Sequence, residues 1–161
     1  MRPARFQEFA VETLLKAPDV KAAEPWQEEG RPFGIHVTFS TGSQLWAAIT
    51  AASTSDKYDR PEVPVIDVPP AEVPVPDLYD DGKITPSRAE QYLAAMLTNA
   101  GNAEIAQVYT YTSGERAAEP NNHPGVGLVF HSESRIFVLF QHTARAGQGK
   151  GGQPFDLQSA F

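Results

Sequence analysis

The 161-residue chain contains no cysteine, which excludes disulfide bonds and thiolate metal ligands. Its 13 Lys and Arg residues against 20 Asp and Glu residues leave a net charge of -7. That shortage of positive charge argues against nucleic acid as a partner, because such binding neutralises phosphates with Lys and Arg. No apolar run approaches the ~20 residues of a membrane span, and no basic, then apolar, leader opens the chain. We expect an acidic, cytoplasmic protein with no membrane partner.

Motifs for covalent catalysis and nucleotide binding are also missing from the sequence. There is no cysteine nucleophile and no GxSxG elbow, so nucleophilic catalysis has no candidate. The glycine-rich stretch GQGKGG, residues 147 to 152, lacks the GxxxxGK[ST] spacing of a phosphate-binding loop. These absences favour a protein that is not an enzyme and has no cofactor.

The strongest positive signal is internal similarity. Residues 34 to 50 align without a gap on residues 125 to 141, and residues 3 to 17 align in the same way on residues 86 to 100. In the first alignment three positions are identical, namely those of Gly34, Phe39 and Ser43. Two copies of one unit usually pack as a pseudo-symmetric pair with a shared core. The sequence therefore predicts an internal repeat within one domain covering residues 1–161.

Hydrophobic periodicity gives the same order of elements in each unit. In the first unit, residues 1–51, we expect a helix over residues 4 to 17, a strand over 20 to 29 that Pro25 interrupts, and a hairpin of residues 35 to 40 and 44 to 50. In the second unit, residues 86–143, we expect a helix that Gly101 ends, then strands over 104 to 112, 126 to 131 and 135 to 142. The predicted fold class is α+β: two tandem helix-plus-three-strand units that form one antiparallel sheet with helices on one face.

An acidic, proline-rich connector, residues 52–85, joins the two units. Six prolines between Pro61 and Pro76 exclude a helix and a central strand. Eight acidic residues against Lys57 and Arg60 lie between Asp56 and Asp81. We expect an extended polyproline-like strap along the outside of the fold. The glycine-rich tail, residues 144–161, has an apolar end, PFDLQSAF. It resembles either a flexible lead joined to a docking peptide or a frayed terminus, and we favour the frayed terminus.

Strand alternation predicts an apolar face on the far side of the sheet. Pairing His131 with Arg135 places Val126, Leu128 and Phe130 in the core. The reverse face is then too apolar to be left to water. The connector, the tail, a second chain or a partner protein could cover it. The candidate partner-binding residues on this open face are His36, Trp46, Tyr109, Tyr111, Val129, Phe137 and Leu139.

Histidines provide one weak candidate for a metal site. The same register places His142 near Pro124, so that His123 and His142 become neighbours. The same loop holds Glu119, Asn121 and Asn122. Two imidazoles and a carboxylate could bind a divalent metal, but no HxH or HxxxH spacing fixes the ligands. Surface histidines in a turn are the favoured interpretation, with no metal bound.

We therefore hypothesise a non-enzymatic protein-binding module, such as an inhibitor, immunity protein, chaperone or adaptor, that uses the open aromatic face. In this respect the chain resembles tandem helix-plus-meander inhibitor proteins. One alternative is a structural subunit of a virion or secretion machine, an oligomer whose strap and tail contact neighbouring subunits. Another is a small-molecule or metal enzyme of the paired-module type, whose modules begin with a strand that this chain lacks.

Overall fold

The computed structural model describes residues 1–53, 56–112 and 123–161. The helices and strands are α1 (Pro3–Leu14), β1 (Val20–Pro25), β2 (Gly34–Phe39), β3 (Gln44–Ala52), α2 (Pro86–Asn99), β4 (Ile105–Thr110), β5 (Gly125–Phe130) and β6 (Arg135–Ala144). In this described part of the chain, neither helix has the length and apolar character needed to cross a membrane.

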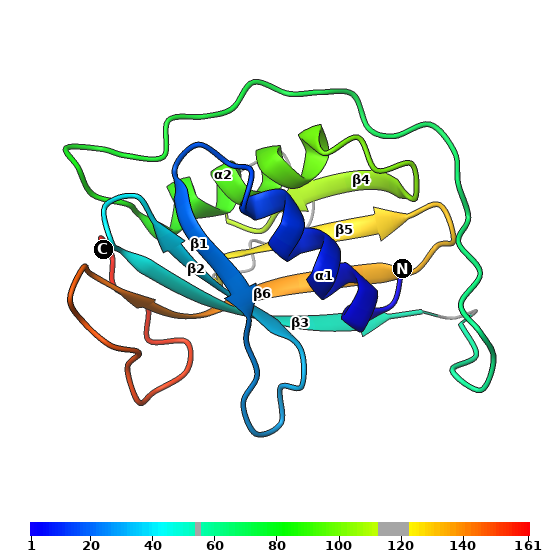
Figure 1. Cartoon of the computed structure of the whole chain (residues 1–161), viewed down its shortest axis with the longest axis horizontal. Coiled ribbons are helices and arrows are strands. Elements are labelled where there is room, and N and C mark those ends of the chain that lie inside the picture. Colours follow the sequence, from blue (N-terminus) through cyan, green and yellow to red (C-terminus); the bar gives the residue numbers. More distant parts are fainter. Residues whose placement is uncertain (54–55, 113–122) are drawn as a thin grey trace.

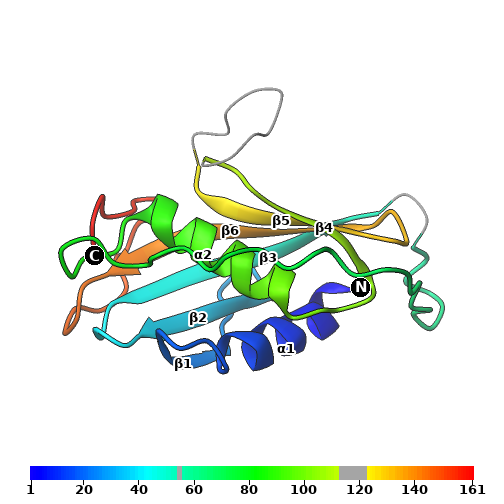
Figure 2. The same cartoon turned by 90° about the horizontal axis from the view of Figure 1, so that it is seen from above.

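The strands form one six-stranded antiparallel sheet in the order β1-β2-β3-β6-β5-β4. The sheet is curled, and each half of the chain supplies three adjacent strands (Figures 1 and 2). β3 and β6 pair at the centre, where Ala48 lies opposite Leu139. These two residues occupy the same position in the alignment of residues 34–50 with 125–141. The predicted α+β class and the antiparallel sheet are confirmed.

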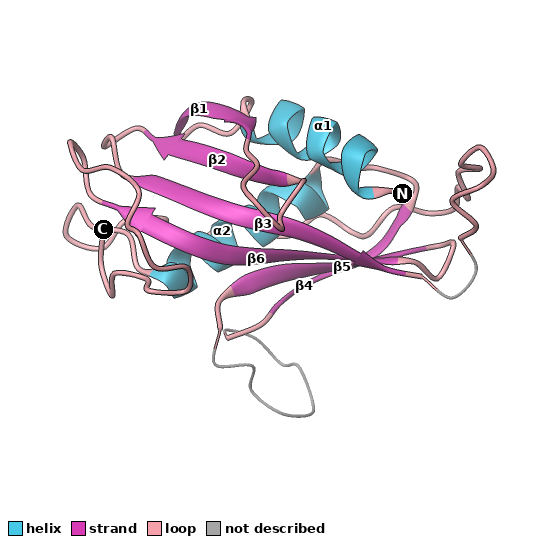
Figure 3. Ribbon diagram, turned by 90° about the horizontal axis from the view of Figure 1, so that it is seen from below, coloured by secondary structure: helices cyan, strands magenta, loops and turns pink. Residues whose placement is uncertain are grey.

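Both helices lie on the same side of the sheet. Seen from below, the strands stand in front of α1 and α2 (Figure 3). Alternate strand residues point toward the helices and form one apolar core with side chains from both halves. Its fully buried members include Phe6, Leu14, Ile35, Val37, Phe39, Leu45, Tyr92, Leu93, Val126, Leu128, Ile136, Val138 and Phe140.

Proline and capping residues set the ends of several elements. Both helices begin with proline in the first turn, where the missing N–H costs no hydrogen bond. The Thr85 hydroxyl also caps α2 by accepting a hydrogen bond of 3.2 Å from the Arg88 N–H. Strand β1 ends at Pro25 rather than at Glu29 as predicted, because proline fixes φ and donates nothing to the ladder.

The predicted register of the second hairpin is wrong by two residues. Arg135 pairs with Val129 instead of His131, and the Phe130 N–H donates to the Ser134 carbonyl across a tight turn. A shift of two residues keeps every side chain on the same face, because side chains alternate with a period of two. The predicted core positions of this hairpin are therefore right although the pairing is not.

The connector runs in an extended path around the outside of the molecule. It leaves β3, passes over α2 on the side away from the sheet, and returns to the start of α2 (Figures 1 and 2). Its described residues, from Asp56 to Ile84, contain no helix or strand. The predicted strap therefore lies on the helix side and does not cover the open face of the sheet.

Candidate functional site

The connector carries six exposed aliphatic side chains, which we call the apolar strip. They are Val63, Val65, Ile66, Val68, Val73 and Val75. Val63 and Val68 expose 79% and 75% of their surface. Single exposed apolar residues are ordinary, but six within thirteen residues of one segment form a patch of the kind that marks interaction sites. The sequence predicted a strap, but did not predict that its valines point away from the protein.

Hydrogen bonds from the second half of the chain hold the backbone of this segment in place. The Asp67 N–H donates to the Ala103 carbonyl at 2.9 Å. The side chain of Asn99 binds both the N–H and the carbonyl of Val73, each at 2.8 Å. At the far end the Arg88 guanidinium donates to the Asp77 carbonyl at 2.9 Å. The apolar strip is thus fixed in an extended form rather than loosely tethered.

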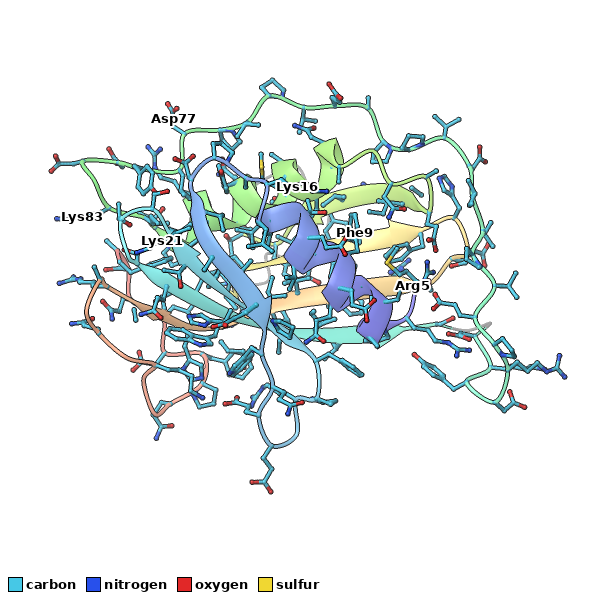
Figure 4. The ribbon with its side chains drawn as sticks, in the orientation of Figure 1. Arg5, Phe9, Lys16, Lys21, Asp77 and Lys83 are labelled. Carbon is cyan, nitrogen blue, oxygen red and sulfur yellow. The ribbon has the colours of Figure 1, made fainter. Side chains whose placement is uncertain are left out.

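An ion-pair network anchors the other end of the connector to α1. Arg5 binds Glu62 on the connector at 2.7 Å and Glu104 ahead of β4 at 2.6 Å. Figure 4 places Arg5 on α1, and Asp77 on the distant stretch of the connector. Hydrogen bonding to Glu104 and Glu62 raises the pKa of Arg5, and hydrogen bonding to Arg5 lowers the pKa of Glu62. The ion pairs therefore stabilise the charged forms of these groups.

The seven predicted partner-binding residues all lie on the face of the sheet away from the helices, in two groups. The His36 and Trp46 rings stack at 4.4 Å, nearly parallel. Tyr109 and Tyr111 form a second group, with ring centroids 5.7 Å apart. Trp46 and Tyr111 expose only 6% and 8% of their surface. Val129, Phe137 and Leu139 are half-buried.

Two segments cover the Trp46 end of this open face: the loop after β1 and the C-terminal tail. The loop crosses in front of the strands (Figure 3). The tail joins it where Lys150 Nζ lies 2.7 Å from Glu28 and 5.3 Å from the centre of the Trp26 ring. The tail also binds β6 directly, since the Phe155 N–H donates to the Gln141 carbonyl at 2.8 Å. The possible covers of this face, from the sequence, are the connector, the tail, a second chain and a partner protein. Of these, the tail does lie on it.

The C-terminal residues are docked, so the interpretation as a frayed terminus is wrong. Phe161 is buried and packs against Phe39 at a ring distance of 6.2 Å. Its N–H and carbonyl each bond to Ile84 at 2.8 Å. The aromatic side chain adds enough buried apolar area to hold the end of the chain in place.

His142 is the most unusual titratable residue of the covered region. It is 2% exposed, and neither ring nitrogen has a hydrogen-bond partner among the described residues. The rings of Trp26 and Trp46 stand edge-on to it at 6.2 and 6.4 Å. Burial lowers its pKa; the charges of Lys150 and Arg31 lower it further, and that of Glu28 opposes them.

The structure does not support the register on which the candidate metal site depended. His123 bonds through Nε2 to the Phe140 carbonyl at 2.7 Å, and His142 lies opposite Trp46 beyond an irregularity in β6. Glu119, Asn121 and Asn122 lie outside the described residues. Within the described ranges no cluster of three or more His, Asp or Glu residues could hold a metal ion.

Sequence reasoning missed two polar residues on the helices that hold the bases of the loops. Gln7 on α1 donates to the carbonyls of Gly34 and Trp26, at 2.7 and 3.5 Å. Glu90 on α2, fully buried, accepts from the N–H groups of Gly125, Tyr111 and Thr112. Positions 7 and 90 coincide in the alignment of residues 3–17 with 86–100. That shared polar position between apolar helix residues is the signal that could have identified them.

Comparison of the chain with protein-family models, curated proteins and solved structures gives no match.

Proposed function

We propose that this chain is a non-enzymatic module that binds another protein, and that the apolar strip of the connector is its main docking surface. The single observation that carries this proposal is the exposure of six aliphatic side chains on a segment whose backbone is anchored. A strap that served only to join the two halves would gain by turning its valines inward. Their outward direction instead supports contact with a partner.

The anchoring favours binding because the strip is already ordered. A flexible segment loses conformational entropy when it docks, and a segment fixed in advance avoids much of that cost. Asn99 and Ala103 fix two points of the strip's backbone, at Val73 and Asp67, without using its aliphatic side chains. An extended, proline-rich segment also has few conformations to lose.

The negative charge of the connector favours a partner that carries Lys or Arg around the contact. The connector between Asp56 and Asp81 holds eight acidic residues and two basic ones. Asp67, Glu72 and Asp77 are exposed and interleave with the apolar strip. A partner with a hydrophobic groove bordered by Lys or Arg would match both features, and the charges would speed association more than they would strengthen the complex.

The open face is a second candidate surface, supported by a narrower observation. Val129, Phe137 and Leu139 remain half-buried in the isolated chain. They lie apart from Trp46, which the loop after β1 and the tail cover. A partner could contact these three side chains without moving either segment.

A pull-down from the native lysate tests the docking surface, with four tagged proteins of confirmed fold. We expect the wild type to retain a stoichiometric partner, and the Val63→Ser/Ile66→Ser/Val68→Ser variant to lose it. Leu15→Ser is the matched control, because Leu15 is a solitary apolar side chain on the surface with 52% exposure. Loss of the partner only in a Trp46→Ala/Phe137→Ala variant would contradict the strip and support the open face.

The assembly-subunit alternative uses the same exposed strip with a second copy of the chain as partner. Sedimentation velocity across a hundredfold range of concentration separates the two. Self-association that the triple serine variant abolishes would support an assembly subunit. A monomer at every concentration would contradict it.

We also infer that the two halves are copies of one unit. Support comes from position as well as from sequence: Ala48 and Leu139 are aligned and also pair at the centre of the sheet. Gln7 and Glu90 likewise hold equivalent loop bases. If a two-fold axis relates the halves, aligned residues must occupy equivalent places in the structure, as these do.

A further inference from the structure

The loop after β1 and the tail together form a cover that we call the clasp, consisting of residues 26–33 and 148–155. One ion pair joins its two parts, Lys150 to Glu28 at 2.7 Å. Glu28 also binds Arg31 within the loop at 2.8 Å. The base of the loop is bonded to the sheet, where the Trp26 N–H donates to the Gly34 carbonyl and the Ile49 N–H to the Phe33 carbonyl. The tail is bonded through Gln44 to the Gln148 carbonyl and through the Phe155 N–H to the Gln141 carbonyl. The Arg31 guanidinium also lies 5.6 Å from the centre of the Phe155 ring, and Gln148, Lys150 and Phe155 are all exposed.

His142 lies beneath this clasp without a hydrogen bond. Both ring nitrogens are buried and unpaired among the described residues, and the neighbouring Gln141 Oε1 is too. Buried polar groups in proteins are nearly always bonded, so three unpaired atoms together call for an explanation. A neutral imidazole in an apolar site of this kind is tolerated, but a charged one is not.

The charged groups around His142 come from both parts of the clasp. The loop supplies Glu28 and Arg31, and the tail supplies Lys150. On the sheet, Trp46 separates His142 from His36, which is bonded to Glu24 and Gln44. A proton on His142 would therefore repel Lys150 and Arg31. It would also compete with Lys150 for Glu28, the group that joins the two parts of the clasp.

We propose that His142 makes the clasp sensitive to pH, so that it is closed in neutral solution and opens in mildly acidic solution to uncover Trp46 and Trp26. The proposal does not depend on the docking surface suggested above. It adds a condition under which a second, aromatic surface becomes accessible.

The direction follows from proton linkage. Closure lowers the pKa of His142, whereas an imidazole in open contact with water titrates near 6.5. The closed form thus binds the proton more weakly than the open form. The closed form is favoured above the open-state pKa, and its advantage falls as the pH drops below that value. Between the two pKa values, the ratio of open to closed molecules rises by up to about tenfold per pH unit.

The chain contains two tryptophans, and both contact His142, so their indole N–H signals report directly on the clasp. We would record ¹⁵N-¹H spectra of the full chain from pH 8 to pH 5. We expect both indole signals and the Phe155 amide to change together in a one-proton transition below pH 7, while far-UV circular dichroism stays constant. Unchanged indole signals, or simultaneous loss of the circular dichroism signal, would overturn the proposal.

Variants separate His142 from the other histidines. In His142→Phe, an aromatic ring of similar shape that cannot titrate, the indole signals should stay in their pH 8 positions throughout. If that variant does not fold, His142→Gln provides the same test. His36→Gln and His131→Gln are the controls and should retain the transition of Trp26. A transition that persists without His142, or that disappears in His36→Gln, contradicts the assignment.

Discussion

The bases of the two long loops, one in each half of the molecule, have the same construction with opposite polarity. In the first half the side-chain amide of Gln7 donates to two backbone carbonyls. In the second half the carboxylate of Glu90 accepts from three backbone N–H groups, and from the Thr112 hydroxyl at 2.7 Å. In both, an aromatic side chain packs on a buried glycine: Trp26 on Gly34, and Tyr111 on Gly125.

One helix residue in each half contacts the backbone where the chain leaves the sheet. A donor at position 7 holds carbonyl groups, and the following loop closes through a pair of backbone bonds between Glu28 and Arg31. An acceptor at position 90 turns the N–H groups of Tyr111 and Thr112 toward the helix. Among the described residues, the helix side chain thus holds the loop base by donating in the first half and by accepting in the second.

Removal of Glu90 should have the largest effect. Glu90→Ala leaves the buried Gly125 N–H without its acceptor and also removes the acceptor of the Thr112 N–H, and we expect a loss of about 3 kcal/mol in the free energy of unfolding. Urea unfolding followed by circular dichroism measures it. Glu90→Gln keeps one acceptor oxygen and should lose roughly half as much. If Glu90→Ala were as stable as the wild type, Glu90 would not hold its loop base, and the comparison with Gln7 would fail.

Replacing the donor amide of Gln7 by an acceptor carboxylate should have the next largest effect on stability. Gln7→Glu places a carboxylate against the carbonyl oxygens of Gly34 and Trp26, and we expect a loss of about 2 kcal/mol at pH 7. The carbonyls and partial burial raise the pKa of the new carboxyl in the folded state. The penalty is therefore present above that pKa and disappears as the pH falls through it. Urea unfolding at pH 7 and pH 5, compared with the wild type, checks this, and a penalty independent of pH would count against it.

Alanine substitution of the two glycines beneath the aromatic rings, Gly34 and Gly125, should lower the free energy of unfolding by similar amounts. A Cβ at Gly34 would lie 2.6 Å from both Trp26 Cε3 and the Ala47 carbonyl oxygen; one at Gly125 would lie 2.6 Å from Tyr111 Cδ2. Backbone atoms cannot move away from an added Cβ. Gly34→Ala and Gly125→Ala should therefore each lower the free energy of unfolding by about 2 kcal/mol. Gly149→Ala is the control, because nothing lies within 4 Å of its Cβ position. Thermal unfolding of the three variants tests this, and a large cost at only one of the two sites would break the equivalence.

Removal of the Gln7 side-chain amide should have the smallest effect on stability. Gln7→Ala removes one good hydrogen bond and one long one, but the Gly34 carbonyl still accepts from the Trp26 N–H. We expect a loss of about 1 kcal/mol, measured by urea unfolding beside Glu90→Ala. An equal loss in the two variants would mean that charge is not what distinguishes the halves.

Much of the fold follows from alternation along the strands. Val126, Leu128 and Phe130 were predicted in the core and are buried there. Alternation fixes which face a residue occupies, but it cannot fix pairing, which is why the hairpin register was wrong by two while the faces were right.

The parts that sequence could not predict depend on contacts between distant segments. The valines of the connector are exposed, and Asn99 and Ala103 bind its backbone. Nothing in a run of valines and prolines indicates which side is anchored. The two segments that cover the Trp46 end of the open face are likewise joined by the Lys150–Glu28 pair, between residues far apart in the chain. All seven candidate residues lie on the predicted face, but their accessibility could not be inferred.

The seam between β3 and β6, with Ala48 opposite Leu139, has a consequence for chain connectivity. Nine residue pairs of this ladder join the halves, and each half contributes a helix and three adjacent strands. The covalent link through the connector therefore acts mainly by setting the effective concentration of one half near the other. A chain severed within the connector would hold its two pieces together as a heterodimer across that seam.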